Sequence, residues 1–500
     1  MLTITQRAGR KEWTALAALM LPVLLVAVDN TVLSFALPAI SLEFNTSGTT
    51  LLWIIDIYPL VLAGLLVAMG SLGDRFGRRR MLITGAVGFA VFSALAAFAP
   101  SAEVLVAARA GLGVFGAMLM PATLSLIRNI FTDRGQRRLA IAVWAAGFSA
   151  GAALGPILGG LLLEHFWWGS VFLLAVPVLV LMLILTPLFV PESKDPAPGA
   201  VDIWSIFLSI ATMLPVVYAI KNLANGGNLM ATLGIAVLGV TAGWLFTRRQ
   251  LRRSQPMLDV RLFTVRPFTG AVLVNLLAVF SLVGFLYFVS QHLQLVLGLS
   301  PLDAGLVLLP GLAITITAGL LAVPLVRRVR PHLVVSAALL LSATAYWMVA
   351  ATPGASAGNL MLAFAVLGAG VGASETLSND LILSSVPAAK AGAASAVSET
   401  AYEVGSVFGT AVLGSILVAA YRQNIDLPAN LTASQQTIAS ETLGGAINTA
   451  AELPGRTADP LLESAFHAFD SGVTVTAGIA SVLMVAAAWL AFRTLRDTQP

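Results

Sequence analysis

Five acidic residues lie within stretches of the sequence that are otherwise almost entirely apolar: Asp29, Asp56, Glu375, Glu399 and Glu403. A charged side chain at the centre of a bilayer costs about 2.5–3.5 kcal/mol on insertion scales, and it usually faces a bundle interior or a water-filled path. Carboxyl groups in such places bind protons or cations and release them again. The pattern therefore favours a transporter of protons, cations or both.

The spacing of these acids predicts shared surfaces. Glu399 and Glu403 are four residues apart and lie on one face of a helix. Asp29 and Asp56 fall at similar depths in two consecutive apolar runs, so we expect both to face one cavity. A low-dielectric environment favours the protonated carboxyl, whereas a neighbouring cation favours the carboxylate. One acid can therefore hold a proton in the empty cavity and lose it when an organic cation arrives.

Aromatic residues near the acids are candidates for cation–π contacts, each worth about 0.5–2 kcal/mol. They are Trp53, Tyr58, Phe148 and Tyr402. Ordinary packing is the alternative for each of them.

A functional role is favoured for Asp29, Asp56 and Glu403, because no basic residue within their own apolar runs is placed to neutralise them. For Glu375, proton coupling, substrate contact and structural pairing all stay open. Asp380 lies at the end of its run and is better explained as an anchor at the membrane interface.

Arg109 lies inside the fourth apolar run, where it is followed by glycines at positions 111, 113 and 116. A buried arginine requires a carboxylate or a carbonyl oxygen as partner. Two roles stay open for Arg109: it perturbs proton transfer by a nearby acid, or it ties helices together.

The composition is that of a polytopic membrane protein. The chain has 500 residues, of which 58% are hydrophobic and 10% charged, whereas soluble domains have about 25% charged residues. The absence of cysteine excludes disulfides and thiolate metal sites, and the four histidines show no metal-like spacing. No phosphate-binding loop with a Gly-Lys-Ser/Thr sequence is present, which argues against an ATP-driven pump.

Hydropathy predicts fourteen membrane-spanning helices. They are placed near 13–35, 49–70, 81–99, 104–126, 138–162, 170–190, 202–221, 229–247, 268–291, 303–326, 333–352, 359–382, 393–420 and 469–491.

The basic residues predict that both termini are cytoplasmic, since positive charge gathers in cytoplasmic loops. With that orientation, every Lys and Arg falls in a cytoplasmic segment except Arg109, Lys221, Arg422 and Arg456. This topology, rather than nucleic-acid binding, explains the net charge of +4 and the pI near 9.6.

Weak internal symmetry predicts three domains. Residues 1–200 and 268–500 each supply a six-helix bundle, and residues 201–267 supply two inserted helices and a basic cytoplasmic linker. Repeated halves around a site near the bilayer midplane are typical of transporters. A polar segment at about 421–469 is expected outside, either as a helical hairpin with helices in 433–451 and 460–469 or as a disordered loop.

Two further segments carry unusual patterns. The segment 70–80 reads GSLGDRFGRRR, whose glycines allow a tight turn and whose Asp74 can meet a helix N-terminus or an arginine across the bundle interface. Such a turn can hold two helices in one conformation and release them in another. The residues of this candidate gate are Gly70, Gly73, Asp74, Arg75, Gly77 and Arg78.

The segment 147–160 reads GFSAGAALGPILGG. Small residues at every fourth position allow another helix to approach closely, and a proline removes one helical hydrogen bond. The residues that define the segment are Gly151, Gly155, Pro156, Gly159 and Gly160.

With these motifs the chain resembles the fourteen-span drug:H+ antiporter family of the major facilitator superfamily, similar to QacA-like and SmvA-like pumps. The segment 70–80 resembles the superfamily's loop motif, Arg109 with Gly113 its proton-linked motif, and 151–160 the antiporter motif. Segments 28–38 and 53–58 resemble signatures of the first two spans, and 391–405 the acidic segment of span 13.

The resemblance covers essentially the whole chain, with departures. Leu112 replaces a usual polar residue, and Ser398 stands where some relatives have another glutamate. Apart from Asp303 at its first position, span 10 has no acid. The preference between monovalent and divalent cations therefore stays open.

The resemblance implies an antiporter of the bacterial inner membrane that exchanges protons for lipophilic cations such as quaternary ammonium biocides, biguanides, viologens and dyes. It implies a monomer driven by the proton motive force, with no cofactor. A proton-coupled uptake symporter of a small nutrient is the alternative. No signalling domain and no catalytic cluster is visible, which argues against a receptor and an enzyme.

Overall fold

The computed structural model describes residues 8–194, 202–224, 226–253, 256–386 and 391–496. Within these ranges the chain is helical and no strand is found. The first helices are α1 (Arg10–Phe44), α2 (Gly48–Phe76), α3 (Arg78–Ala97), α4 (Ala102–Ile130), α5 (Arg134–His165), α6 (Ser170–Leu173) and α7 (Ala175–Phe189). The next are α8 (Ile203–Ala224), α9 (Leu229–Arg252), the 3₁₀ helix η1 (Val260–Thr264), α10 (Arg266–Gln291) and the π-helix η2 (His292–Val296). The last are α11 (Pro301–Leu325), α12 (Pro331–Ala350), α13 (Ala357–Ser384), α14 (Ala391–Phe408), the π-helix η4 (Gly409–Gly414), α15 (Ser415–Asn424), α16 (Ala433–Glu441), α17 (Leu443–Ala451) and α18 (Gly455–Thr494).

Each predicted apolar run coincides with helical structure. In the part of the chain that is described, thirteen helices are long and apolar enough to cross a membrane. They do not include α5, which is 32 residues long and covers the run predicted at 138–162. Two runs are interrupted, one between α6 and α7 and the other by η4 between α14 and α15. The all-α polytopic architecture is confirmed.

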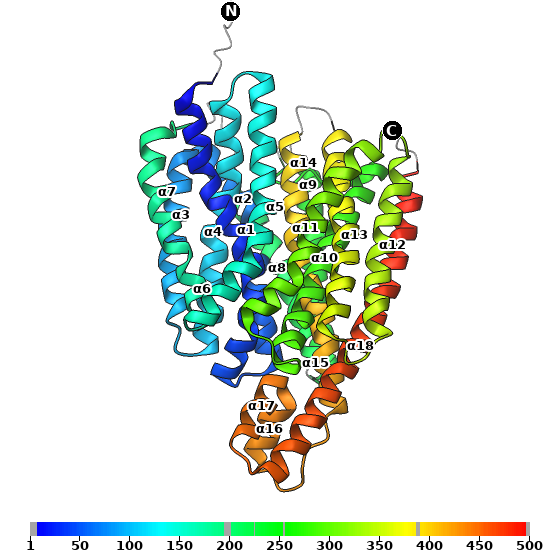
Figure 1. Ribbon diagram of the computed structural model, residues 1–500. Helices are drawn as coiled ribbons and strands as arrows, with labels where there is room; N and C mark the ends of the chain where they lie inside the picture. Colours follow the sequence, from blue (N-terminus) through cyan, green and yellow to red (C-terminus); the bar gives the residue numbers. More distant parts are fainter. Residues whose placement is uncertain (1–7, 195–201, 225, 254–255, 387–390, 497–500) are drawn as a thin grey trace, which may run out of the picture.

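Helix starts follow from local chemistry. Ser47, Ser101, Ser300 and Ser356 precede α2, α4, α11 and α13, and each hydroxyl accepts a hydrogen bond from a backbone N–H of the first helical turn. Such caps satisfy N–H groups that have no partner within the helix. Because the loops between capped helices are short, consecutive helices run antiparallel (Figure 1).

The helices form two groups that meet at two interfaces. Helices α1–α7 lie on one side of the view and α10–α13 with α18 on the other (Figure 1). Helices α14 and α15 belong to the second group, since α14 packs against α10 and α15 against α18. The groups are joined where α5 packs against α11 and where α2 packs against α14. The boundaries at residues 200 and 267 stay predictions.

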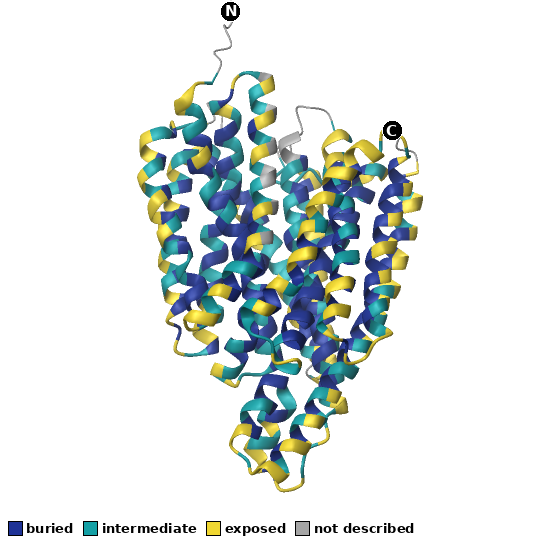
Figure 2. Cartoon of the chain, in the orientation of Figure 1, coloured by how far each residue is buried: buried dark blue, intermediate teal, exposed yellow. Residues whose placement is uncertain are grey.

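The inserted pair α8 and α9 packs together, and α8 also contacts α2 from one group and α15 from the other. Large apolar side chains of this pair are exposed, among them Trp204, Phe207, Leu238 and Trp244. Figure 2 shows the same pattern across the molecule, with buried residues on inward helix faces and exposed residues outside. Such a surface suits lipid contact.

The segment predicted as a hairpin or a loop is helical. We call residues 426–469, with α16, α17 and the first part of α18, the helical hairpin. The helix predicted over 433–451 is divided at Thr442, whose backbone is extended and whose hydroxyl caps α17. The second predicted helix is not separate, because α18 continues unbroken for 40 residues from Gly455 into the last span.

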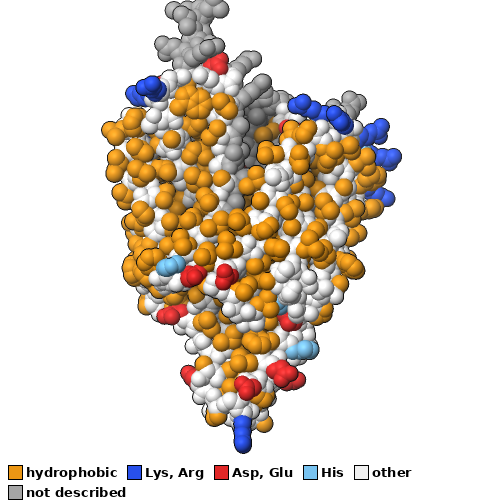
Figure 3. Space-filling view, in the orientation of Figure 1, with side chains coloured by type: hydrophobic (Ala, Val, Ile, Leu, Met, Phe, Trp, Pro, Cys, Tyr) orange, Lys and Arg blue, Asp and Glu red, His pale blue; other side chains and the backbone are white. Residues whose placement is uncertain are grey.

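The helical hairpin lies at the end of the molecule opposite to the start of α1 and the end of α18, which share one end (Figure 1). It is attached to the α1–α2 connection through Asn448, whose Nδ2 donates to the carbonyl oxygen of Leu42 and to Oδ1 of Asn45, both at 2.6 Å. On the face shown in Figure 3, Lys and Arg side chains gather mostly at the end where α1 begins, and acidic ones mostly toward the hairpin.

Candidate transport site

Asp29 of α1 forms a buried ion pair with Arg109 of α4. The distance from Arg109 Nη1 to Asp29 Oδ2 is 2.6 Å, and Arg109 Nε donates to the carbonyl oxygen of Ile54 at 3.1 Å. Arg109 is 1% exposed and Asp29 7%. The arginine therefore has both of the partners that its burial requires, and it connects α1, α2 and α4.

Tyr58 supports this arginine rather than lining an open space. Its ring centroid lies 4.7 Å from Arg109 Cζ, and its side chain is fully buried. Helix α4 approaches α2 this closely because residue 113 is glycine: a Cβ on Gly113 would lie 2.7 Å from the carbonyl oxygen of Tyr58. The tyrosine that the sequence suggested as a substrate contact thus packs against Arg109.

Asp56 of α2 forms a second buried pair, with Lys221 of α8. Lys221 Nζ lies 2.8 Å from Asp56 Oδ2 and donates to the carbonyl oxygen of Leu52 at 2.9 Å. Both side chains are buried. The sequence placed Lys221 at the outer end of the run predicted at 202–221, but α8 extends to Ala224 and the lysine is buried.

The two pairs lie on different faces of α2. Ile54 and Tyr58, four residues apart, share the face toward Arg109, and Asp56 lies two residues from each, toward the other side of the helix. The expectation that Asp29 and Asp56 face one cavity therefore differs from the structure. No basic residue of its own run neutralises either acid, as the sequence indicated, but each acid is paired with a cation from another helix.

Glu403 of α14 lies across the interface between the two helix groups. It is 5% exposed, its Oε2 has no hydrogen-bond partner, and no ion pair is found for it among the described residues. It lies beside Asn30 of α1 and close enough to Asp29 and Glu399 for electrostatic repulsion. The structure thus brings Asp29 and Glu403 together.

The other acids of this half lie around Glu403. Glu399 is half-buried and faces Arg128 near the end of α4. Glu375 of α13 is also half-buried, and no ion pair is found for it within the described ranges. Tyr402 lies near Glu375 and Glu403, with its ring edge-on to Phe148 of α5 at 5.3 Å between centroids. Asp380, near the end of α13, is exposed.

A polar cluster that sequence reasoning missed ties α10, α13 and α14 together. Asn275 Nδ2 donates to Asn379 Oδ1 and to Ser398 Oγ, both at 2.9 Å, and the hydroxyl of Ser398 donates to Asn379. A signal was present, because Asn379 follows Glu375 by four residues and Ser398 precedes Glu399.

The candidate gate at 70–80 comprises the end of α2, Gly77 and the start of α3. Gly77 ends α2 with φ of 115°, a conformation that favours glycine, and a Cβ there would lie 2.8 Å from Glu192 Oε1. Asp74 pairs with Arg78 of the same turn at 2.7 Å, rather than with an arginine across the bundle interface. The backbone N–H of Arg79 donates to Glu192 at 3.0 Å, which fixes the turn to the segment after α7. Arg75 is exposed.

The segment 151–160 packs α5 against two helices. A Cβ on Gly151 would lie 2.7 Å from the carbonyl oxygen of Leu24, and one on Gly155 would lie 1.9 Å from Thr31 Oγ1, so α1 touches this face directly. Gly159 faces Val32 of α1. On another face, a Cβ on Gly160 would lie 2.7 Å from Leu302 Cα of α11.

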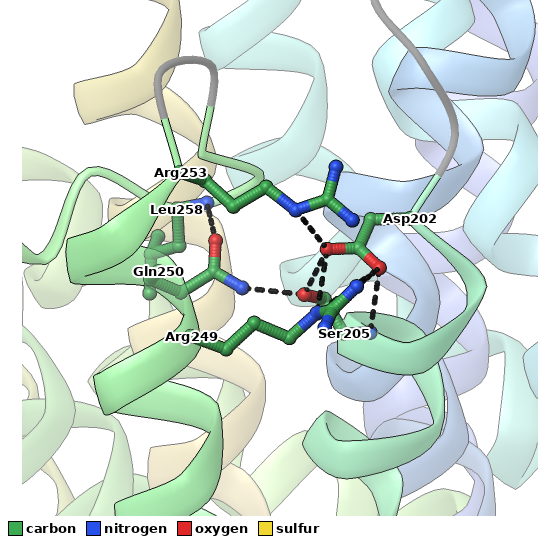
Figure 4. Close-up of polar contacts among 6 residues, drawn as sticks. All are labelled: Asp202, Ser205, Arg249, Gln250, Arg253 and Leu258. Atoms are coloured by element: carbon green, nitrogen blue, oxygen red, sulfur yellow. Dashed lines mark hydrogen bonds and ion pairs between the residues drawn. The ribbon is translucent and has the colours of Figure 1, made fainter.

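At the end of the inserted pair where α8 begins and α9 ends, an acid that sequence reasoning did not single out holds two arginines (Figure 4). Asp202 Oδ1 accepts from Arg249 Nη2 at 2.8 Å, and Arg253 Nε lies 3.2 Å from Asp202 Oδ2. Gln250 donates to Ser205 Oγ and accepts from the N–H of Leu258, which fixes the linker. The hydrogen bonds from the Arg249 guanidinium hold the pKa of the Asp202 carboxyl well below its usual range.

Comparisons with known proteins agree with this architecture. A family model described as Major Facilitator Superfamily matches residues 19–410. The chain is 58% identical over 485 residues to the multidrug efflux pump LfrA of Mycolicibacterium smegmatis, covering 97% of this chain and 96% of the relative. It is 38% identical over 487 residues to the methyl viologen resistance protein SmvA of Salmonella typhimurium, covering 96% and 98%.

Among solved structures, the chain is similar in fold to a bacterial homologue of the human lysosomal transporter Spinster in an inward-facing, unoccupied conformation. The TM-score is 0.68 and the identity 18%, over 98% of each chain. With helices that suit a bilayer and bacterial relatives aligned along nearly their whole length, the protein is a multi-pass bacterial membrane transporter, not an enzyme. The chain belongs to the major facilitator superfamily.

Proposed function

We propose that this transporter is an antiporter that exports lipophilic organic cations in exchange for protons. The observation that carries the proposal is Glu403, a buried acid that has no cation partner among the described residues and lies beside the Asp29–Arg109 pair. An unpaired acid in a low-dielectric interior favours its protonated form until a cation arrives. The relatives named as a multidrug efflux pump and as a methyl viologen resistance protein support drug export.

The exchange follows from this charge balance. In the empty protein, Glu403 holds a proton and Asp29 is neutralised by Arg109. A lipophilic cation that enters between α1, α5 and α14 is attracted by the carboxylate form of Glu403, and Phe148 and Tyr402 supply aromatic surface for it. Binding therefore expels the proton, and release of the cation on the other side allows a proton to bind again.

The proposed orientation places the end with the start of α1 and the end of α18 in the cytoplasm, and the helical hairpin outside. Arginines support it, because Arg78 and Arg79 begin α3, while Arg328 and Arg330 lie in the connection α11–α12. Both places face that end (Figure 1). A membrane potential supplies about 2.3 kcal/mol per charge per 100 mV. It drives export whenever more positive charge enters than leaves.

The test uses proteoliposomes that contain the purified protein, a pH-sensitive dye inside and ethidium as the cation. We expect an imposed proton gradient to drive ethidium transport and ethidium to drive proton movement in the opposite direction. Glu403→Gln should abolish both movements, whereas Glu463→Gln, which changes an exposed glutamate of the helical hairpin, should keep both. Unchanged coupled transport in Glu403→Gln would refute the proposal.

A further inference from the structure

Lys221 is a buried charged residue on a helix whose exposed side chains are mostly apolar. Helix α8 presents exposed apolar side chains such as Phe207, Leu214 and Leu223, yet Lys221 is 1% exposed and points toward α2. Burying an ammonium group is costly unless its hydrogen bonds and its charge are both satisfied. The groups that satisfy it therefore form a site for a positive charge.

Three groups of α2 surround the ammonium. Asp56 Oδ2 is 2.8 Å from Nζ, the carbonyl oxygen of Leu52 accepts at 2.9 Å, and the ring centroid of Trp53 is 3.9 Å away. A carboxylate, a carbonyl oxygen and an indole face are the groups that recognise organic ammonium ions, because a desolvated cation is attracted both to negative charge and to an aromatic face. We call Leu52, Trp53 and Asp56 the cation box.

The cation box lies where both helix groups and the inserted pair meet. Its carboxylate belongs to α2, its present occupant to α8, and Thr410 of η4 lies beside Asp56. Trp53 is half-buried, and its ring lies 6.4 Å from that of Tyr218, which is 44% exposed. The aromatic wall of the box thus extends from the buried carboxylate to the outer surface of α8.

We propose that the cation box is a binding site for monovalent organic ammonium ions and that Lys221 fills it as a tethered cation when no such ion is bound. A carboxylate in a low-dielectric interior compensates one positive charge well and two poorly. An ion that enters the box therefore displaces Lys221 and loosens the contact between α8 and α2. This inference rests on the proposed function, since it assigns a second cation site to the same transporter.

The first test removes the tether and supplies a free ammonium ion to the purified full-length protein. In Lys221→Ala, n-butylammonium chloride should raise the melting temperature in a saturable way, whereas sodium chloride at equal ionic strength and 1-butanol at equal concentration should not. Asp56→Asn/Lys221→Ala should lose the response, because the carboxylate is gone. Lys194→Ala, which changes an exposed lysine, should respond like the unmodified protein. An equal response in all four proteins would overturn the proposal.

The second test measures binding of tetraphenylphosphonium. Lys221→Ala should bind it at least about tenfold more tightly than the unmodified protein, the scale of one desolvated cation–aromatic contact. Butylammonium should compete in this variant, and adding Trp53→Leu should abolish the gain. Lys221→Gln, which keeps a neutral donor for Asp56 and Leu52, replaces Lys221→Ala if the latter does not fold. Unchanged affinity in the lysine variant would show that Lys221 only holds α8 in place.

The two proposals fail separately. If the protein shows no proton-coupled ethidium transport but butylammonium still raises the melting temperature of Lys221→Ala, the cation box stands in a different kind of transporter. If butylammonium does not raise the melting temperature of Lys221→Ala but coupled transport is observed, the cation-box proposal is refuted and the antiporter proposal stands.

Discussion

Thr31 of α1 donates its hydroxyl hydrogen to the carbonyl oxygen of Ala152 in α5, with 3.0 Å between the two oxygens. Pro156 has no N–H, so the carbonyl four residues before it lacks its helical donor. Thr31 supplies the missing hydrogen bond from the neighbouring helix. The proline in α5 and the threonine beside Asp29 and Asn30 are therefore matched.

Replacing this threonine by its apolar near-isostere tests the match. Thr31→Val keeps the shape but leaves the Ala152 carbonyl without a donor. We expect the free energy of unfolding to fall by about 0.6–2 kcal/mol, the range of hydrogen bonds between membrane helices. The change is measured as a lower melting temperature in detergent. The control is Thr344→Val, since the exposed Thr344 donates only within α12. Equal losses in both variants would contradict the match.

The closeness of α1 and α5 predicts that Gly155 cannot carry a side chain. In Gly155→Ala the new Cβ would lie 1.9 Å from Thr31 Oγ1, so the helices must separate. We expect a destabilisation of about 1–3 kcal/mol from overpacking and a loss of ethidium transport. Gly478→Ala is the control, because no atom lies within 4 Å of a Cβ at that position.

A second substitution tests whether the destabilisation by Gly155→Ala comes from the steric clash with Thr31. Thr31→Ala removes the clashing oxygen, so the double variant should regain part of the melting temperature lost by Gly155→Ala. A double variant that is less stable than either single variant would show that the contact does not set the helix separation.

The Asp29–Arg109 pair predicts that removing both charges restores stability but not transport. Asp29→Asn leaves a buried arginine without its carboxylate, which costs about 3–5 kcal/mol when one partner of a buried pair is removed. Asp29→Asn/Arg109→Gln removes both charges and should recover most of the melting temperature. Transport should stay lost in both variants, because the charge beside Glu403 has changed. Recovered ethidium transport in the double variant would assign the pair a purely structural role.

Asp202 predicts a dependence of stability on pH. Its pKa is lowered in the folded protein by hydrogen bonds from Arg249, so its contribution is present above the unfolded value, about 3.9, and is lost as pH falls through the folded value. Asp202→Asn should therefore have a lower melting temperature than the unmodified protein. The difference should be constant between about pH 5 and about pH 8, because the Asp202 carboxyl is ionised in both the folded and the unfolded protein over that range. The difference should narrow in more acidic buffer. A difference that widens on acidification would contradict the assignment.

Much of the fold could be predicted because its signals are local. A run of about 20 apolar residues is sufficient to place a spanning helix, and each predicted run coincides with helical structure. The sequence did not predict that the helix over 433–451 is divided at Thr442. A threonine that caps a helix cannot be distinguished, in the sequence alone, from a polar residue within one helix.

The site was harder to predict because its pairs join distant parts of the sequence. The acids were visible as charges in apolar runs, but their partners were not: Lys221 is 165 positions after Asp56, and nothing in either run indicates that α8 lies against α2. The same limit applies to Asp74, whose sequence permitted a partner across the interface but whose nearest arginine in space is also near in the chain. Roles for Glu375 and Glu399 stay predictions.

The 40 residues of α18 form one rod of about 60 Å at 1.5 Å per residue, roughly twice the depth of a hydrocarbon core. Half of this rod must project beyond the bilayer, where it joins the other two helices of the helical hairpin. A lever of this kind magnifies motion: a small tilt of its embedded half sweeps the distal tip through a larger arc. An antibody fragment or fluorophore fixed at the tip would therefore report rearrangements deep in the membrane without disturbing them.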